Sequence, residues 1–422
     1  MKSRPHAKNI RRYAVIRTYL VGGAVRDRLL GKPVRERDFV VVGATPGEML
    51  ARGFRQVGNH FPIFLHPQTN EEYALARCRR SNASGEVVYD ESVTLEQDLA
   101  RRDLTINAMA EDESGDLIDP HGGRDDLQRR ILRHVSDAFS EDPIRVLRVA
   151  RFMARYADLG FTLAPETHAL IKEMVVAGQL ENLVAERVWQ ELCGALGETQ
   201  PRQFFELLRS LGALRPIFPE LDALFGVPQP AAWHPEVDCG EHTLMALQVA
   251  VDLSEDLEVR FATLTHDLGK ATTPKRILPS HYGHEERGTR LIDQLCNRIS
   301  APKRFRELAR SSASYHGYLH RLHELRPKTV LKMLTGLGAF RQPQRLHQFI
   351  LVCQADFQGR GGFHQRPYPQ GEDLMRLYRA AAEVTSATQD ASLMGRLLGD
   401  AIERERIERI GELMRSFTTP AQ

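Results

Sequence analysis

The sequence predicts an α+β protein, with a small head of mixed strands and helices followed by a long helical body. Short β-branched runs bounded by glycine and proline fall within residues 18–133. After residue 142 the apolar residues recur at helical spacing to the end of the chain. Gly/Pro-rich breaks divide this helical part near residues 197–201, 225–235, 274–279 and 359–371.

Composition bounds the class of protein. The chain has 422 residues, which corresponds to roughly three domains of about 150 residues each. With 42% hydrophobic and 27% charged residues, and no apolar run of 18, it is neither disordered nor membrane-spanning. The five cysteines are scattered and form no CxxC pair, which predicts a reducing, cytoplasmic location. Because the net charge is only +2, local basic patches would have to hold any nucleic-acid partner.

Residues 1–17 form a basic arm, and no acidic residue precedes Asp27. The arm lacks the apolar segment of a secretory signal and shows no amphipathic period. We interpret it as a disordered basic arm or an over-extended start, and a transit peptide stays the less favoured alternative. Its cationic residues are Lys2, Arg4, Lys8, Arg11, Arg12 and Arg17.

The elements of the head follow in order. A strand over 18–21 turns at Gly22-Gly23 into a helix over 24–30, which Gly31 and Pro33 end. Two further strands are expected over 37–42 and 72–77. A hairpin is expected last, with strands over 104–110 and 117–119 around the turn-rich segment 112–116.

Gly22-Gly23 lies where a phosphate can approach backbone N–H groups at the positive end of a helix. Alone, it is equally typical of a plain turn. Two carboxylates, Glu36 and Asp38, then enter a strand on one face, and such oxygen ligands suit Mg²⁺ bound to a nucleoside triphosphate. Arg102 is a candidate for neutralising that triphosphate, although, taken singly, a surface basic pair explains it better.

A helix is predicted to begin at Asp142, as its N-cap, with Pro143 in the first turn. Four arginines on one face of this helix have no acid four residues away, so we expect an anion to balance them. They are Arg145, Arg148, Arg151 and Arg155.

These segments together resemble the class II tRNA nucleotidyltransferases, the CCA-adding enzymes of the polymerase-β-like superfamily. The matching stretches are LVGGAVRD (20–27), RD (37–38), RRDLTINA (101–108) and EDPIRVLRVARF (141–152). The resemblance runs in order from residue 18 to the last fifth of the chain. It implies a polymerase-β-like nucleotidyltransferase head, an all-helical neck and body, and a tail that contains an HD domain.

The resemblance also implies roles. Glu36 and Asp38 would be the catalytic carboxylates that bind Mg²⁺. Asp142 and Arg145 match the EDxxR motif, whose side chains pair with the edge of the incoming base in place of a template. The residues expected to bind CTP or ATP are Gly23, Arg26, Arg102, Asp142, Arg145, Arg148 and Arg151. A neck helix over 185–192, with Glu186 and Glu191, would support this site.

Two departures from the family pattern bear on activity. Glu36 replaces the first metal-binding aspartate and is one methylene longer. The segment 78–92 is shorter than in matching relatives and keeps only Tyr89 as an aromatic residue. In the family this loop is associated with the switch from CTP to ATP. An enzyme that adds only CC therefore stays open as an alternative.

A second site is predicted in the helical body. His242, the pair His266-Asp267 and Asp356 occur in the ligand order of HD-domain phosphohydrolases. Such a set suits a divalent transition metal such as Ni²⁺, which activates water on a phosphoester. The segment resembles the HD domain of some bacterial CCA enzymes, which implies 2′,3′-cyclic phosphodiesterase, 2′-nucleotidase and phosphatase activity. His281 lies nearby in the sequence, and His284 and His316 are candidates for further ligands or phosphate contacts.

The expected domains are a basic arm (1–17), the head (18–135), a helical neck and body (136–230), the HD domain (231–340) and a helical tail (341–422). The expected partners are CTP, ATP and a tRNA recognised by shape and backbone, with no membrane, in a monomer or homodimer. An HD phosphohydrolase whose degenerate head only binds tRNA remains an alternative. Poly(A) polymerase activity shares the head motifs, but the HD segment disfavours it.

Overall fold

The computed structural model of the chain describes residues 15–34, 36–57, 63–79, 87–88 and 91–417, with 79, 87 and 88 described by their backbone alone. The described residues form two compact units. The first lies within Met1–Val149 and Leu159–Met174, and the second within Ala150–Asp158 and Val175–Gln422. Most of the predicted basic arm, residues 1–14, lies outside the described residues.

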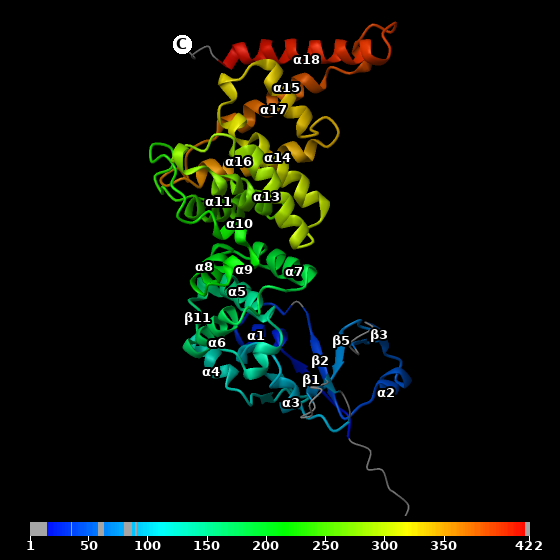
Figure 1. Cartoon of the computed structure of the whole chain (residues 1–422). Helices are drawn as coiled ribbons and strands as arrows, with labels where there is room; N and C mark the ends of the chain where they lie inside the picture. The colour runs from blue at the N-terminus through cyan, green and yellow to red at the C-terminus, as the bar shows by residue number, and fades with distance from the viewer. Residues whose placement is uncertain (1–14, 35, 58–62, 80–86, 89–90, 418–422) are drawn as a thin grey trace, which may run out of the picture. The chain divides into compact units, whose positions relative to one another are not determined.

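A mixed sheet of seven strands forms the frame of the first unit, in the order β3-β4-β5-β2-β1-β8-β9. Figure 1 labels β1, β2, β3 and β5 of this sheet. The pair β2 and β5 is parallel, and the other neighbours are antiparallel. The strands are β1 (Arg17–Val21), β2 (Asp38–Val42), β3 (Arg55–Val57), β4 (Ile63–Leu65), β5 (Glu72–Leu75), β8 (Ala110–Glu111) and β9 (Leu117–Ile118). Two small sheets pair β6 (Cys78–Arg79) with β7 (Val87–Val88), and β10 (Ile131–Leu132) with β11 (Thr162–Leu163).

Each face of the sheet carries its own apolar core. On one face Val21 and Val40 pack with Leu95 and Leu99 of α3 (Leu95–Leu99). On the other, Val41 packs with Met49 of α2 (Pro46–Ala51). Side chains alternate along a strand, and directly paired residues share a face. Asp38 pairs with Val21, so it emerges on the α3 face.

The predicted strand over 104–110 is wrong in its first part. Thr105–Asn107 form a 3₁₀ turn, and only Ala110–Glu111 join the sheet. The polar side chains explain the difference, because Thr105 Oγ1 donates to Asp126 at 2.7 Å. Gly123 packs so closely here that a Cβ would lie 2.2 Å from the Thr105 carbonyl oxygen. These contacts join residues that are distant in the sequence, and the β-propensity of residues 104–110 does not predict them.

The helical periodicity after residue 142 is confirmed, with β11 as a short exception in the predicted all-helical neck. Helix α5 (Arg145–Tyr156) follows a turn at Pro143 and Ile144. Asp142 is extended, as an N-cap residue is, and its carbonyl oxygen accepts from the Arg145 N–H at 3.0 Å. The remaining helices of the first unit are α1 (Gly23–Leu29) and α4 (Gly123–Arg129). Helix α6 (Pro165–Val176) ends just inside the second unit.

The second unit is helical (Figure 1). Helices α11, α12, α14 and α16 pack on one another, and α18 packs on α15 and α17. Its helices are α7 (Ala185–Leu196), α8 (Arg202–Ser210), α9 (Leu214–Ile217), α10 (Pro219–Asp222), α11 (Cys239–Leu253), α12 (Leu257–Thr265), α13 (His284–Arg298), α14 (Lys303–His320), α15 (Pro327–Gly336), α16 (Pro343–Gln358), α17 (Pro369–Ala382) and α18 (Gly395–Phe417).

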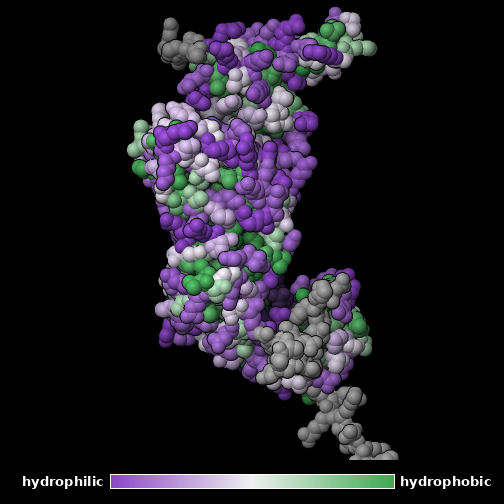
Figure 2. All heavy atoms as spheres, in the orientation of Figure 1, coloured by the Kyte–Doolittle hydropathy of each residue, from purple (hydrophilic) through white to green (hydrophobic). Residues whose placement is uncertain are grey.

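Helix α12 is buried from Val259 to Thr265, as expected of a helix without a polar face. It therefore carries the next two residues, His266 and Asp267, into the interior of the second unit. Hydrophilic residues prevail on the visible face of this unit, with hydrophobic residues scattered among them (Figure 2). Among the described residues, no helix combines the length and apolar character needed to cross a membrane.

Candidate active sites

The Gly-Gly turn requires glycine at its first position. Gly22 has φ 68° and ψ −125°, and a Cβ there would lie 2.7 Å from Arg102 Nη1. Arg102 also donates from Nη1 to the carbonyl oxygen of Asn107 at 3.3 Å. The turn before α1 and the predicted phosphate ligand Arg102 are therefore in direct contact.

A buried polar network lies behind this turn. Arg26 is only 4% exposed and donates to Asp27 at 2.9 Å and to the side-chain oxygen of Asn107. Asn107 donates in turn to Asp103 Oδ1 at 3.0 Å, and Arg148 Nε lies 2.9 Å from Asp103 Oδ2. The structure thus brings together three predicted nucleotide-binding arginines, Arg26, Arg102 and Arg148. Sequence reasoning assigned no role to Asp103 or Asn107, although both stand in the RRDLTINA segment.

Burial by itself would raise the pKa of the Asp103 carboxyl. The charge of Arg148 and the hydrogen bonds from Asn107 and the Leu104 N–H more than offset burial, and the pKa lies below its ordinary value. Asp103 is therefore a buried anion that holds Arg148.

Of the two predicted metal carboxylates, Asp38 is the first residue of β2, whereas Glu36 lies two residues before the strand; both are exposed. Partial desolvation raises the pKa of Asp38, Arg102 opposes this, and the charge of Glu36 adds to it. Asp38 is therefore within electrostatic reach of both Glu36 and Arg102. Glu72, which sequence reasoning missed, pairs with Asp38 in the parallel register of β5 and shares its face. Mg²⁺ is usually held by one or two carboxylates together with substrate phosphates, and Glu36 and Asp38 fit that donor set.

Arg145 is held by the backbone. Its guanidinium donates to the carbonyl oxygens of Ala138, at 2.6 Å, and Arg101, at 2.5 Å. Burial lowers the pKa of Arg145, while the charges of Asp103 and Asp142 raise it. The charge of Asp142 therefore acts on Arg145, and the role of the two residues in reading a base stays a prediction.

The arginine face of α5 is partly balanced by the protein itself. Asp103 pairs with Arg148, and Glu191 of the neck helix α7 accepts a hydrogen bond from Arg151 Nε at 2.7 Å. Gly194 leaves the space for Arg151, since a Cβ there would lie 2.5 Å from Arg151 Cδ. The expectation that an outside anion is needed to balance this face is therefore too strong. Arg151 belongs to the second unit, where its contact with Glu191 lies.

The second unit brings together the four predicted metal ligands. His242 Nε2 lies 2.9 Å from Asp356 Oδ1, and His266 Nε2 lies 3.2 Å from Asp267 Oδ2. All four side chains are buried. They come from α11, the end of α12, the residue after it, and α16. Burial alone would lower the pKa of His266, but Asp267 and Asp356 raise it to about 10.

Asp267, His284 and His316 offer a second, adjoining set of ligand atoms. Asp267 Oδ1 lies 3.4 Å from His284 Nε2 and 3.5 Å from His316 Nε2, and the two nitrogens are 3.3 Å apart. Nδ1 of each ring faces a backbone carbonyl oxygen, His281 for His284 and Ser312 for His316, and so carries the ring proton. Two nitrogen lone pairs and a carboxylate oxygen then converge, which is a suitable donor set for a cation.

Other polar groups surround these ligands, and sequence reasoning missed them. Glu236 lies 2.9 Å from His242 Nδ1 and 3.0 Å from His234 Nδ1, and these contacts hold the pKa of its carboxyl well below the ordinary range although burial opposes them. Lys270 donates to Asp267 Oδ2 at 2.5 Å. His320 contacts Asp356 Oδ2 at 2.6 Å, a helical turn after His316, and this spacing was the available signal. Such partners orient metal ligands.

His281 is not among the ligands. Its Nε2 lies 3.0 Å from the Pro228 carbonyl oxygen and its Nδ1 lies 2.8 Å from Thr273 Oγ1. Both ring nitrogens are thus used to hold loops together.

A cavity of about 670 Å³ opens on the histidine cluster. It is lined by Trp233, Phe357, Arg321 and Arg360 beside His284, His316, His320 and Asp356.

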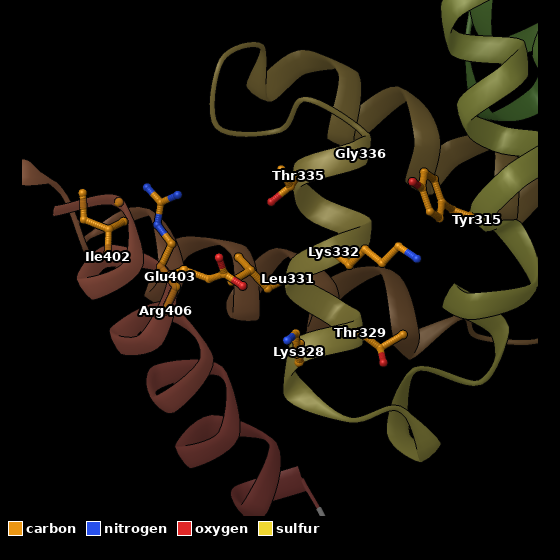
Figure 3. A pocket seen from close by; sticks show the side chains of 11 residues that line it. Tyr315, Lys328, Thr329, Leu331, Lys332, Thr335, Gly336, Ile402, Glu403 and Arg406 are labelled. Atoms are coloured by element: carbon orange, nitrogen blue, oxygen red, sulfur yellow. The ribbon is translucent and has the colours of Figure 1, made fainter. Parts of the chain in front are cut away.

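Another cavity, of about 670 Å³, lies among α14, α15 and α18. Figure 3 shows its lining, where Lys332 reaches toward Tyr315. Glu403 is the one carboxylate among the residues that line it, with no histidine or cysteine, so this cavity offers no comparable ligand set.

Three family descriptions match successive parts of the chain. They are the Poly A polymerase head domain over residues 18–133, the probable RNA and SrmB-binding site of polymerase A over 160–225, and the HD domain over 239–338. A tRNA-processing enzyme solved with CTP is 26% identical, with a TM-score of 0.58 over 94% of this chain and 97% of that one. A CCA-adding enzyme in an apo form shares the fold, with a TM-score of 0.62 at 19% identity over 95% and 91% of the two chains.

Curated relatives are much closer in sequence. A multifunctional CCA protein of Thioalkalivibrio sulfidiphilus is 58% identical over 94% of this chain and 98% of its own length. The multifunctional CCA protein of Nitrosococcus oceani is 56% identical over 93% of this chain and 97% of its own length. The chain belongs to the family of multifunctional CCA proteins, which makes it a nucleotidyltransferase that carries an HD domain.

Proposed function

We propose that this enzyme adds CCA to tRNA 3′ ends from CTP and ATP without a nucleic-acid template. The assignment of nucleotide addition to the head rests on one observation. Arg26, Arg102 and Arg148 converge through Asn107 and Asp103 on the turn beside Asp38. Cations gathered at a Gly-Gly turn before a helix suit a triphosphate.

In this proposal Glu36 and Asp38 would hold Mg²⁺, which when bound would help to activate the tRNA 3′ hydroxyl and to neutralise the leaving pyrophosphate. The hydroxyl oxygen would bond to the α-phosphorus as the α–β phosphoanhydride bond breaks, with its proton released to solvent and pyrophosphate as the leaving group. Gly23 offers the helix N-terminus to the phosphates, and Arg102 lies across the turn to neutralise them. Arg148 and Arg151 contact phosphates and sugar, and Arg26 holds Asn107 in place.

Asp142 and Arg145 would read the base. Two backbone carbonyls fix the Arg145 guanidinium, and Asp142 supplies acceptors beside its donors. An acceptor and donors together match the edge of cytosine and, after a small rotation, of adenine. Rigid groups can select a base because little entropy is lost on binding.

For the second unit we propose a metal-dependent phosphohydrolase that acts on 2′,3′-cyclic and 2′-phosphate ends of RNA. His242, His266, Asp267 and Asp356 would hold a divalent transition metal such as Ni²⁺, with His284 and His316 as further ligands. The metal supplies an activated water. The buried, converging ligand atoms support this proposal.

The tRNA would lie along the helical part, whose boundaries we propose at 136–230, 231–340 and 341–422. Several arginines of α8 and α14 that would be candidates for RNA contact are paired within the protein. Arg202 bonds Glu206, Arg304 lies 3.1 Å from Glu258, and Arg310 pairs with Asp293. RNA contact by these residues would have to compete with these pairs.

Gel analysis at single-nucleotide resolution tests the head, with a tRNA lacking CCA, Mg²⁺ and CTP, with and without ATP. We expect three added nucleotides with both substrates, and none for Asp38→Ala. Asp125→Ala is the matched control, because that carboxylate is exposed on α4 and pairs only with Arg129 among the described residues. Unchanged addition by Asp38→Ala would refute the head assignment.

Two added nucleotides would instead establish the CC-adding alternative, which the short segment 78–92 favours. Residues 80–86 and 89–90 of that segment, including Tyr89, lie outside the described residues. For the second unit, replacing His266 and Asp267 by alanine should abolish hydrolysis of 2′,3′-cyclic AMP and leave nucleotide addition intact. Loss of both activities would mean that the two sites do not act separately.

A further inference from the structure

One large aromatic side chain on the wall of the histidine cavity is left in solvent. Trp233 is 67% exposed and lines that cavity. The other tryptophan, Trp189, packs against Phe261 and Phe305, with ring centroids 5.5 and 4.8 Å away. An exposed indole at a cavity wall offers a flat apolar surface to a ligand.

Trp233 is held at a defined place relative to the metal ligands. The backbone N–H groups of Trp233 and His234 both donate to the Pro230 carbonyl oxygen at 3.0 Å. The next side chain, His234, is buried and its ring lies 4.6 Å from the ring of His242. Glu236 contacts both of these imidazoles. The turn that presents the indole is thus anchored to a residue of the proposed metal site.

The same cavity presents groups suited to a phosphate. Lys270, Arg321 and Arg360 line it. Arg360 lies with its guanidinium 5.5 Å from the Phe357 ring centre, and its buried Nε has no hydrogen-bond partner among the described residues. A buried donor without an acceptor is costly, and a phosphate oxygen would satisfy it. The cavity volume, about 670 Å³, is within the range of small-molecule sites, about 300–1,000 Å³.

We propose that this cavity contains a nucleobase subsite, in which the base of a terminal nucleotide stacks on Trp233 while its phosphate faces Arg360 and the histidine cluster. The inference rests on the proposed phosphohydrolase function and specifies its substrate. The site takes nucleoside phosphates at an RNA end in preference to phosphate esters without a base. Stacking tolerates any base, because every base has a π-face.

Tryptophan fluorescence of the full-length chain with Mg²⁺ tests the subsite without turnover. We expect 2′-AMP to quench the emission of Trp233, while glycerol 2-phosphate, which has no base, leaves it unchanged. Trp189, which is half-buried and packs against Phe261, serves as the internal reference. The quench should disappear in Trp233→Ala and persist in Tyr282→Ala, a matched control because Tyr282 is 78% exposed and does not line the cavity. Absence of a quench in the unmodified chain overturns the subsite.

Hydrolysis supplies the second measurement. With Ni²⁺ added, Trp233→Ala should lower the kcat/KM ratio of 2′-AMP over glycerol 2-phosphate by about 5- to 150-fold, the usual range for loss of one stacked base. Trp233→Phe should restore most of this preference. An unchanged ratio refutes the inference. A chain that hydrolyses neither compound but still shows the quench would instead refute the phosphohydrolase and keep the subsite.

Discussion

Asp103 provides the sharpest test of how the head is built, because its buried carboxylate joins the 3₁₀ turn Thr105–Asn107 to helix α5. Its Oδ1 accepts from the Leu104 N–H at 2.8 Å and from Asn107 at 3.0 Å, and Oδ2 faces Arg148 Nε at 2.9 Å. The isosteric change Asp103→Asn keeps an oxygen for the first two bonds. It replaces Oδ2 by an amide donor that points at the Arg148 donor.

The cost follows from these contacts. A hydrogen bond to a charged group contributes about 1.5–3 kcal/mol, which applies to the bonds from Leu104 and Asn107 to the Asp103 carboxylate. A fully buried pair broken on one side loses about 3–5 kcal/mol, but the Arg148 side chain is 40% exposed and can turn to water. We therefore expect Asp103→Asn to lower the unfolding free energy of the first unit by about 2–3 kcal/mol. The KM for CTP should rise as well, because Arg148 and Asn107 lose their common anchor.

Urea unfolding followed by hydrogen-exchange mass spectrometry measures this change in peptides of the first unit. Intrinsic tryptophan emission would report the other unit, which contains both tryptophans. Asp125→Asn is the control, since Asp125 and Arg129 form an exposed pair on α4 whose loss should change stability by less than about 1 kcal/mol. A loss no larger than the control's would show that the network does not support the fold.

The pH dependence of the Asp103 contribution has a definite sign. The folded-state pKa of Asp103 lies below its ordinary value, so the ionised carboxylate stabilises the folded state. The contribution is complete above the unfolded pKa of about 4, and it is lost as the pH falls through the folded pKa. The stability difference between the unmodified chain and Asp103→Asn should therefore shrink below about pH 4 and stay constant near neutrality.

Two further predictions concern the second unit. Gly269→Ala would place a Cβ 1.9 Å from the His284 carbonyl oxygen and 2.5 Å from the Gly288 nitrogen. It should lower the unfolding free energy of the second unit by about 1–3 kcal/mol or more. Phosphohydrolysis should be abolished and nucleotide addition retained. Tryptophan-detected urea unfolding measures this, and Gly399→Ala, which has open space, should not destabilise the unit. The pKa of His266 is raised to about 10, so Ni²⁺ must displace the proton of this imidazole when it binds. The affinity of the second unit for Ni²⁺ should therefore fall as the pH is lowered from 9 to 7. Calorimetry at pH 8 in buffers of different ionisation enthalpy should detect about one released proton per ion, and a release of zero contradicts this protonation state.

The sequence by itself predicted the order of the parts and the chemistry of the main residues. Spacing along one helix placed Arg145 and Arg148 on one face, and the apolar character of 257–265 carried His266 and Asp267 into the interior. These are local properties, since periodicity and burial follow directly from residue types. Short motifs with fixed spacing also carried the family resemblance.

Tertiary structure decided which groups balance those residues. Asp103 reaches Arg148 across 45 positions of the chain, and Glu191 reaches Arg151 across 40. Glu236 and His320 likewise join His242 and Asp356 only in the folded chain. The strand predicted over 104–110 became a 3₁₀ turn for the same reason. An ion pair or close glycine contact depends on where distant segments meet in space, and propensity along the chain does not contain that information.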